Sequence, residues 1–170
     1  MLAVEWHPME QTALHSLAWG PELTTGDARM DATHETFVEL LNQLMALPPE
    51  AQMPLYLRVI DHTVEHFAQE ERWMLATGFA PENCHALQHA SILETLQAVR
   101  THTDQGDNTL IGRLAVALAE WFPQHAATMD AGLALHLQSL GYDTRTETLP
   151  EDSPVRPATM SGCGSVSCSG

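Results

Sequence analysis

Residues 66–74 read HFAQEERWM, and this stretch decides how the rest of the chain is interpreted. Its His66 and Glu70 are four residues apart, so on an α-helix both side chains lie on one face. Imidazole and carboxylate are common metal-ligand groups. The stretch therefore predicts a helix that directs a pair of metal ligands to the interior of a fold.

Three further segments carry residues of the same kinds. Residues 85–89 read HALQH, residues 121–130 read WFPQHAATMD, and residues 19–34 read WGPELTTGDARMDATH. Seven nitrogen and oxygen ligands are more than one tetrahedral zinc ion uses, which favours two metal ions bridged by the carboxylates. Imidazole with carboxylate suits iron, although ligand type alone leaves manganese and zinc open. The candidate ligands are His34, His66, Glu70, His85, His89, His125 and Asp130.

Hydrophobic spacing of three and four residues predicts four long helices around these segments. We find no alternating strand pattern, and the predicted connections are short, which favours antiparallel neighbours. The predicted fold class is all-α, an up-down-up-down four-helix bundle with the metal centre in its core. Residues 1–18 are interpreted as an N-terminal extension, 19–143 as the bundle and 144–170 as a disordered tail rich in Pro, Ser, Thr and Gly. The predicted helices cover about residues 31–47, 51–77, 81–103 and 109–140.

The composition excludes several classes of protein. The 170 residues hold 22 Asp and Glu against seven Arg and no Lys, a formal net charge of -15. Such a chain lacks the basic patch that nucleic acids or anionic membrane surfaces require. No apolar run is long enough for membrane insertion, and the N-terminus lacks the basic region of a signal peptide. The three cysteines form no disulfide framework, so we expect a cytoplasmic protein.

Taken together, the four segments resemble those of bacterial hemerythrins, over about residues 19–142. The resemblance implies two non-haem iron ions with an oxo or hydroxo bridge. One iron would be held by three histidines and the other by two, which leaves the second with an open position for dioxygen. The implied ligands are His85, His89 and His125 for the first iron, His34 and His66 for the second, and Glu70 and Asp130 as bridges.

The resemblance implies reversible O2 binding, for transport, storage or delivery, by a carrier and not an enzyme. Five neutral imidazoles and two carboxylates carry less negative charge than the carboxylate-rich di-iron sites of ferritin-like proteins, which favours ferrous iron. Two alternatives stay open at this point. One is an oxygen or redox sensor, and the other is a di-iron peroxidase or nitric-oxide-handling enzyme.

The family resemblance also predicts an apolar O2 pocket, lined by Phe37, Trp121, Phe122 and Ala126. Phe37 and Ala126 stand where the family usually has leucine and isoleucine.

Some residues near the predicted ligands need separate interpretations. His62 lies one turn before His66 and is interpreted as a packed or rim histidine, with a role as hydrogen-bond partner of the site as the alternative. Cys84 is interpreted as a passive small residue, and the pair Cys163 and Cys168 is weak evidence for a metal site or a disulfide.

The fourth helix has a spacing problem. His125 and Asp130 are five residues apart, about 140° around an ideal α-helix, so they cannot both point inward from a regular helix. Pro123 lies two residues before His125 and removes one helical hydrogen bond. We therefore predict a kink or a π-type turn between Trp121 and Asp130.

Overall fold

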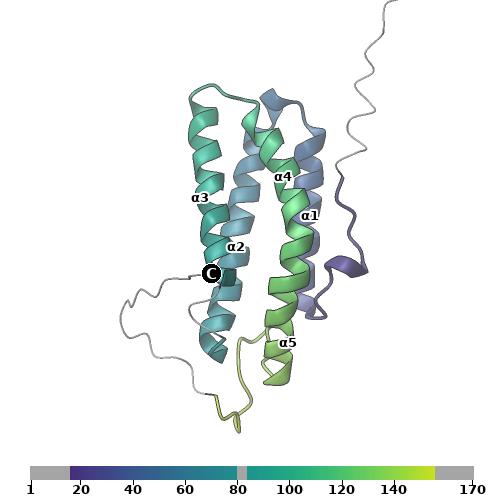
Figure 1. The fold of residues 1–170 in the computed structure, drawn as a ribbon, viewed down its shortest axis with the longest axis vertical. Coiled ribbons are helices and arrows are strands. Elements are labelled where there is room, and N and C mark those ends of the chain that lie inside the picture. Colours follow the sequence, from purple (N-terminus) through teal and green to yellow (C-terminus); the bar gives the residue numbers. More distant parts are fainter. Residues whose placement is uncertain (1–15, 80–83, 156–170) are drawn as a thin grey trace, which may run out of the picture.

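The computed structural model describes residues 16–79 and 84–155, and its fold is all-helical. The fourth rod of the bundle is a continuous helix built from α4 (Leu110–His125), a π-helix (Ala126–Asp130) and α5 (Ala131–Ser139). Four rods lie side by side, with α1 next to α2 and α4, and α3 next to α2 and α4 (Figure 1). This arrangement confirms the predicted four-helix bundle. The long elements are α1 (Ala28–Ala46), α2 (Met53–Thr77), α3 (Cys84–Asp104), α4 (Leu110–His125), the π-helix (Ala126–Asp130) and α5 (Ala131–Ser139).

The helix ends follow local chemistry. The carboxylate of Asp27 accepts hydrogen bonds from the backbone N–H groups of Arg29 and Met30, so α1 begins three residues before the predicted start. At the end of α2, Gly78 takes the left-handed conformation with φ of +66°, which a glycine adopts without strain. The predicted start of the third helix, at Pro81, lies outside the described residues.

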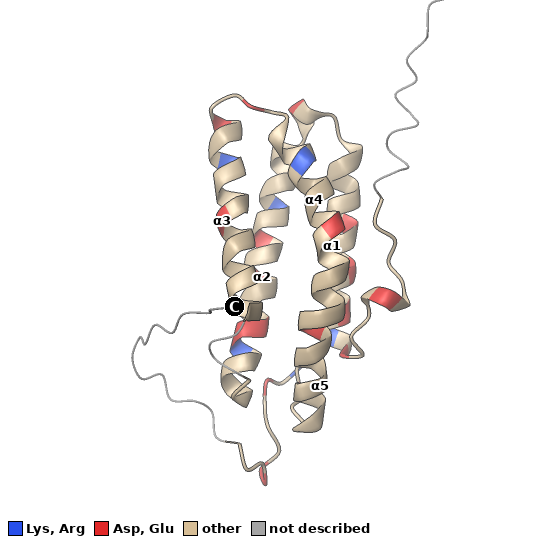
Figure 2. Ribbon diagram, in the orientation of Figure 1, with Lys and Arg blue, Asp and Glu red and all other residues tan. Residues whose placement is uncertain are grey.

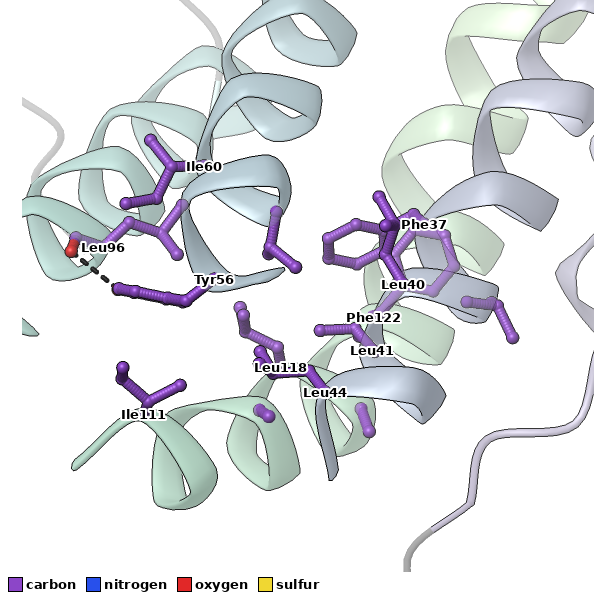
Figure 3. Close-up of a cluster of buried hydrophobic side chains, with 14 of the residues drawn as sticks. Phe37, Leu40, Leu41, Leu44, Tyr56, Ile60, Leu96, Ile111, Leu118 and Phe122 are labelled. Atoms are coloured by element: carbon purple, nitrogen blue, oxygen red, sulfur yellow. Dashed lines mark hydrogen bonds between the residues drawn. The ribbon is translucent and has the colours of Figure 1, made fainter. Parts of the chain in front are cut away.

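A large apolar cluster fills one half of the bundle. Its side chains come mainly from α1, α2 and α4, and Figure 3 shows them pointing toward one another. The hydroxyl of Tyr56 donates a 2.7 Å hydrogen bond to the carbonyl of Leu96, which satisfies the polar end of a buried ring and ties α2 to α3. A second cluster contains Met30, Trp73 and Leu133.

The predicted ligands lie between these two clusters. On α1, His34 is about one turn from Met30 in the second cluster and about one turn from Phe37 in the first. On the fourth rod, Asp130 lies between Ala126 of the first cluster and Leu133 of the second. The polar residues are therefore enclosed by apolar packing on both sides along the bundle.

The chain after α5 contacts the end of the bundle. Thr144 donates through its hydroxyl to Asp27, and Arg29 donates to the Thr144 carbonyl at 2.7 Å. Glu147 pairs with Arg29 and with Arg72, each at 3.4 Å. Residues 144–149 therefore lie against α1 and α2, which differs from the disorder that composition predicts there. Residues 156–170, with Cys163 and Cys168, lie outside the described part of the chain.

Acidic positions occur along the helices of the bundle, with few arginines among them (Figure 2). Glu35 and Glu39, for example, are exposed on α1. Within residues 16–79 and 84–155, no helix is both long and apolar enough to cross a membrane.

Candidate metal centre

Seven buried polar side chains from all four rods converge in the interior of the bundle. Helical spacing explains two pairs, because His66 and Glu70 are four residues apart on α2, and His85 and His89 are four apart on α3. The other three come from α1, the end of α4 and the end of the π-helix. The seven are His34, His66, Glu70, His85, His89, His125 and Asp130.

Glu70 lies between two groups of histidines. Its Oε1 is 2.8 Å from Nε2 of His66 and 3.8 Å from Nε2 of His34. Its Oε2 is 3.1 Å from Nε2 of His85 and 3.4 Å from Nε2 of His89. Each carboxylate oxygen therefore faces a different pair of imidazoles, which is the placement that a bridging ligand needs.

Asp130 faces the same two groups from the fourth rod. Its Oδ2 is 3.2 Å from Nε2 of His34, and its Oδ1 is 2.9 Å from Nε2 of His85 and 3.1 Å from Nε2 of His125. Potential ligand atoms within each of two sets lie no more than 4.8 Å from one another. One set is Glu70, His85, His89, His125 and Asp130, and the other is His34, His66 and Glu70.

The hydrogen bonding of these atoms tests whether the residues fit metal ions. Although they lie close together, Nε2 of His34, Nε2 of His85, Oε2 of Glu70 and both carboxylate oxygens of Asp130 are buried and make no directed hydrogen bond. Unsatisfied buried polar atoms are costly and uncommon in folded proteins. A pair of cations would accept these lone pairs, so the donor set fits two metal ions, and imidazole with carboxylate suits iron.

Electrostatics keeps the two carboxylates ionised. Burial would raise the pKa of both Glu70 and Asp130, but the neighbouring histidines outweigh burial and hold both pKa values well below the usual range. Burial also disfavours the charged form of His34 and His85, yet the two carboxylates raise the pKa of each imidazole to about 9. A metal cation that binds here must displace these protons, as is usual for histidine sites.

Contacts behind the cluster fix several of the rings. The ring of Phe67 stacks on His89 with centroids 3.7 Å apart, and Trp121 stacks on His125 at 4.4 Å. Nδ1 of His125 is 2.9 Å from Oε1 of Gln88. The spacing of the candidate ligands does not predict these roles for Phe67 and Gln88. Their positions in the sequence could have suggested these roles, because each residue is adjacent to a predicted ligand.

The predicted irregular turn is present. Residues 126–130 form a π-helix, and the backbone N–H of Ala131 donates to the carbonyl of Ala126, five residues earlier. The wider turn accommodates one additional residue, so that His125 and Asp130 both reach the interior. Nε2 of His125 lies 3.1 Å from Oδ1 of Asp130. The prediction of a π-type turn is therefore confirmed.

The four residues predicted to line a pocket all belong to one apolar cluster or pack against it. Phe122 stands edge-on to His34 with ring centroids 5.0 Å apart, and Phe37 packs edge-on against Phe122 at 5.0 Å. Ala126 is buried in the same apolar cluster. Trp121 packs against this cluster, with its ring centroid 6.5 Å from that of Phe122, and also stacks on His125.

His62 lies beside the two-histidine side, half-buried and outside both ligand sets. Its Nε2 is 3.2 Å from the carbonyl of Thr33, and its ring stacks on Phe37 at 6.1 Å. Burial and the nearby His66 lower the pKa of His62 to about 4. Cys84, at the start of α3, is exposed and has a free thiol. The His62 ring lies 6.0 Å from that of His66, and neither His62 nor Cys84 belongs to the two ligand sets.

Comparison with known proteins identifies a family with which this chain shares its sequence pattern. The sequence model of the Hemerythrin HHE cation binding domain matches residues 25–135. A protein named bacteriohemerythrin from Ralstonia nicotianae is 37% identical over 131 residues, which is 77% of this chain and 96% of that protein. The bacteriohemerythrin of Pseudomonas aeruginosa strain PAO1 is 28% identical over 121 residues, 68% of this chain and 78% of that protein. No solved structure gives a significant match.

Proposed function

The chain belongs to the hemerythrin family, and on that premise we propose that its bundle, residues 19–143, binds O2 reversibly at a di-iron centre. The family implies a non-haem di-iron centre, and the buried cluster has the donors to hold it. When bound, such a centre supplies two ferrous ions whose electrons can be shared with O2 and recovered. The activity is that of a carrier and not of an enzyme.

The assignment of ligands follows the two sets of contacts. We assign the three-histidine position to His85, His89 and His125, and the two-histidine position to His34 and His66. Glu70 supports a bridging assignment because its oxygens face different sets. Asp130 supports the same assignment because its Oδ1 faces His85 and His125 while its Oδ2 faces His34.

The observation that carries the proposal is the unequal division of histidines beside an apolar wall. The two-histidine position offers one fewer protein ligand than the other, which leaves room for a small exogenous molecule. Phe122 and Phe37 cover this side, and both are nearly fully buried. We propose that these two rings exclude water from the bound O2. Ala126 completes the apolar wall, and Trp121 supports it by stacking on His125.

The ligand set also favours a carrier over an oxygen-activating enzyme. Among the described residues, Glu70 and Asp130 are the only carboxylates in the two ligand sets. A third buried acid that could deliver a proton for cleavage of an oxygen–oxygen bond is not found within those sets.

A spectroscopic titration tests the function. We expect the reduced, iron-loaded protein to gain a visible charge-transfer band under O2 and to lose it when the gas is removed, over repeated cycles. Irreversible oxidation after a single exposure, together with consumption of many equivalents of peroxide, would contradict the carrier and favour the peroxidase. Zinc-loaded protein serves as the control, because zinc has no accessible redox chemistry and should give no band.

The apolar wall makes a separate prediction. Phe37→Ala removes a ring that packs on Phe122 and His66, so we expect faster oxidation in air and a loss of about 3–5 kcal/mol in the free energy of unfolding. Phe37→Leu keeps an apolar side chain and should stay close to the parent in oxidation rate. The measurements are the decay of the oxygenated spectrum and thermal unfolding. Equal oxidation rates for the parent and Phe37→Ala would show that Phe37 does not shield the site.

A further inference from the structure

We propose that Gln88 is a positioning residue that fixes the His125 imidazole in the tautomer whose Nε2 can bind a metal ion. The inference rests on the ligand role proposed for His125. Oε1 of Gln88 lies 2.9 Å from Nδ1 of His125, although the two residues are 37 positions apart in the sequence and belong to α3 and α4.

The chemistry of the contact selects one tautomer. A neutral imidazole carries one N–H donor and one acceptor nitrogen, and a carbonyl oxygen can only accept. The amide oxygen of Gln88 therefore requires the proton on Nδ1, which leaves the lone pair on Nε2. That nitrogen is 3.1 Å from Oδ1 of Asp130 and 3.2 Å from Nε2 of His89, inside the ligand cluster.

The contact is also specific to one ligand position. Within residues 16–79 and 84–155, Nδ1 of His66, His85 and His89 has no hydrogen-bond partner. Nδ1 of His34 faces the Leu23 carbonyl at 3.5 Å, a longer contact. Gln88 thus stabilises a histidine of the three-histidine set, and among the described residues no side chain accepts from Nδ1 of His34 or His66 in the other set.

Trp121 and Gln88 contact different parts of the His125 ring and restrain it in different ways. Trp121 stacks against the face of His125, with centroids 4.4 Å apart and planes 30° apart, which limits the tilt of the ring. Stacking does not distinguish the two nitrogens, since a flipped imidazole presents nearly the same face. The hydrogen bond that His125 donates to Gln88 does distinguish them, so removal of the amide should affect metal affinity more than packing.

The test uses Gln88→Leu, which keeps the volume and removes the acceptor, and Gln88→Glu, which keeps an acceptor. Zinc is the probe, because it is diamagnetic and its binding can be measured by competition with a chelator. We expect Gln88→Leu to weaken one of the two zinc equivalents about 10–100-fold and to leave the other unchanged. Gln88→Glu should retain both. Gln97→Leu, at an exposed position of the same helix, is the matched control.

Nuclear magnetic resonance supplies a second readout. In the zinc-loaded parent we expect a slowly exchanging Nδ1–H of His125, and in Gln88→Leu a faster exchange of that proton. Two equally tight zinc equivalents and an equally protected proton in Gln88→Leu would overturn the inference alone. Fewer than two zinc equivalents in the parent would instead show that the proposed ligand set is wrong, and the role of Gln88 would fall with it. Neither readout depends on O2.

Discussion

Glu70→Gln should reduce the iron content of the protein from two ions to one or none per chain. The substitution keeps the size of the side chain but replaces one carboxylate oxygen by an NH2 group, which donates and cannot bind a cation. Because Oε1 faces His66 and Oε2 faces His85, either orientation of the amide removes an oxygen from one set. The lost negative charge weakens the remaining position as well.

The adjacent residue provides a matched control. Glu71 is exposed on α2, so Glu71→Gln removes the same charge one position along the same helix without touching the cluster. We expect this variant to keep two iron ions by elemental analysis. The Glu70→Gln protein should also lose the rise in unfolding temperature that metal loading gives the parent, since a ligand stabilises only the state that binds it. Two tightly bound ions in Glu70→Gln would show that Glu70 is not a bridge.

Helical periodicity alone predicts that His66 with Glu70, and His85 with His89, share a common face, whereas the complete set of seven residues was implied by the family resemblance. The irregular turn could also be predicted, since a spacing of five residues between His125 and Asp130 does not suit a regular α-helix. Both predictions depend on local geometry within one helix. Neither requires knowledge of how the helices are rotated against one another.

The spacing of residues within one helix could not predict which side chains of different helices contact one another. Whether Gln88 on α3 meets His125 on α4 depends on the relative rotation of the two helices, which the spacing within either helix does not set. Composition likewise gave no sign that residues 144–149 lie against the bundle. That placement depends on Glu147 meeting arginines from two helices distant in the sequence.

The π-helix allows a pair of opposite predictions about Asp130. Insertion of one alanine after Ala127 lengthens the spacing from His125 to six residues, beyond the one additional residue that the wide turn absorbs. Asp130 and α5 would then rotate by about 100° relative to α4. The carboxylate would leave the cluster and Leu133 would leave the core, so we expect loss of bound metal and a large fall in unfolding temperature.

Deletion of Ala127 should have the smaller effect, although it shortens the chain inside the same turn. Ala127 is exposed, and its removal gives His125 and Asp130 the spacing of four residues that His66 and Glu70 already have. A regular α-helix would then hold the two side chains about 40° apart, still on one face. We expect this variant to stay helical by circular dichroism and to bind metal.

An alanine inserted between Gly106 and Asp107, in the exposed connection between α3 and α4, controls for the general cost of an insertion. Loops tolerate added residues because the entropy of closing them rises slowly with length, so this control should keep two metal ions. If the insertion after Ala127 also kept two ions, the wide turn would not be what directs Asp130 inward. If the deletion variant alone lost metal, the wide turn would be needed to set the position of the carboxylate along the helix axis. Its direction around the axis would then not be enough to bind metal.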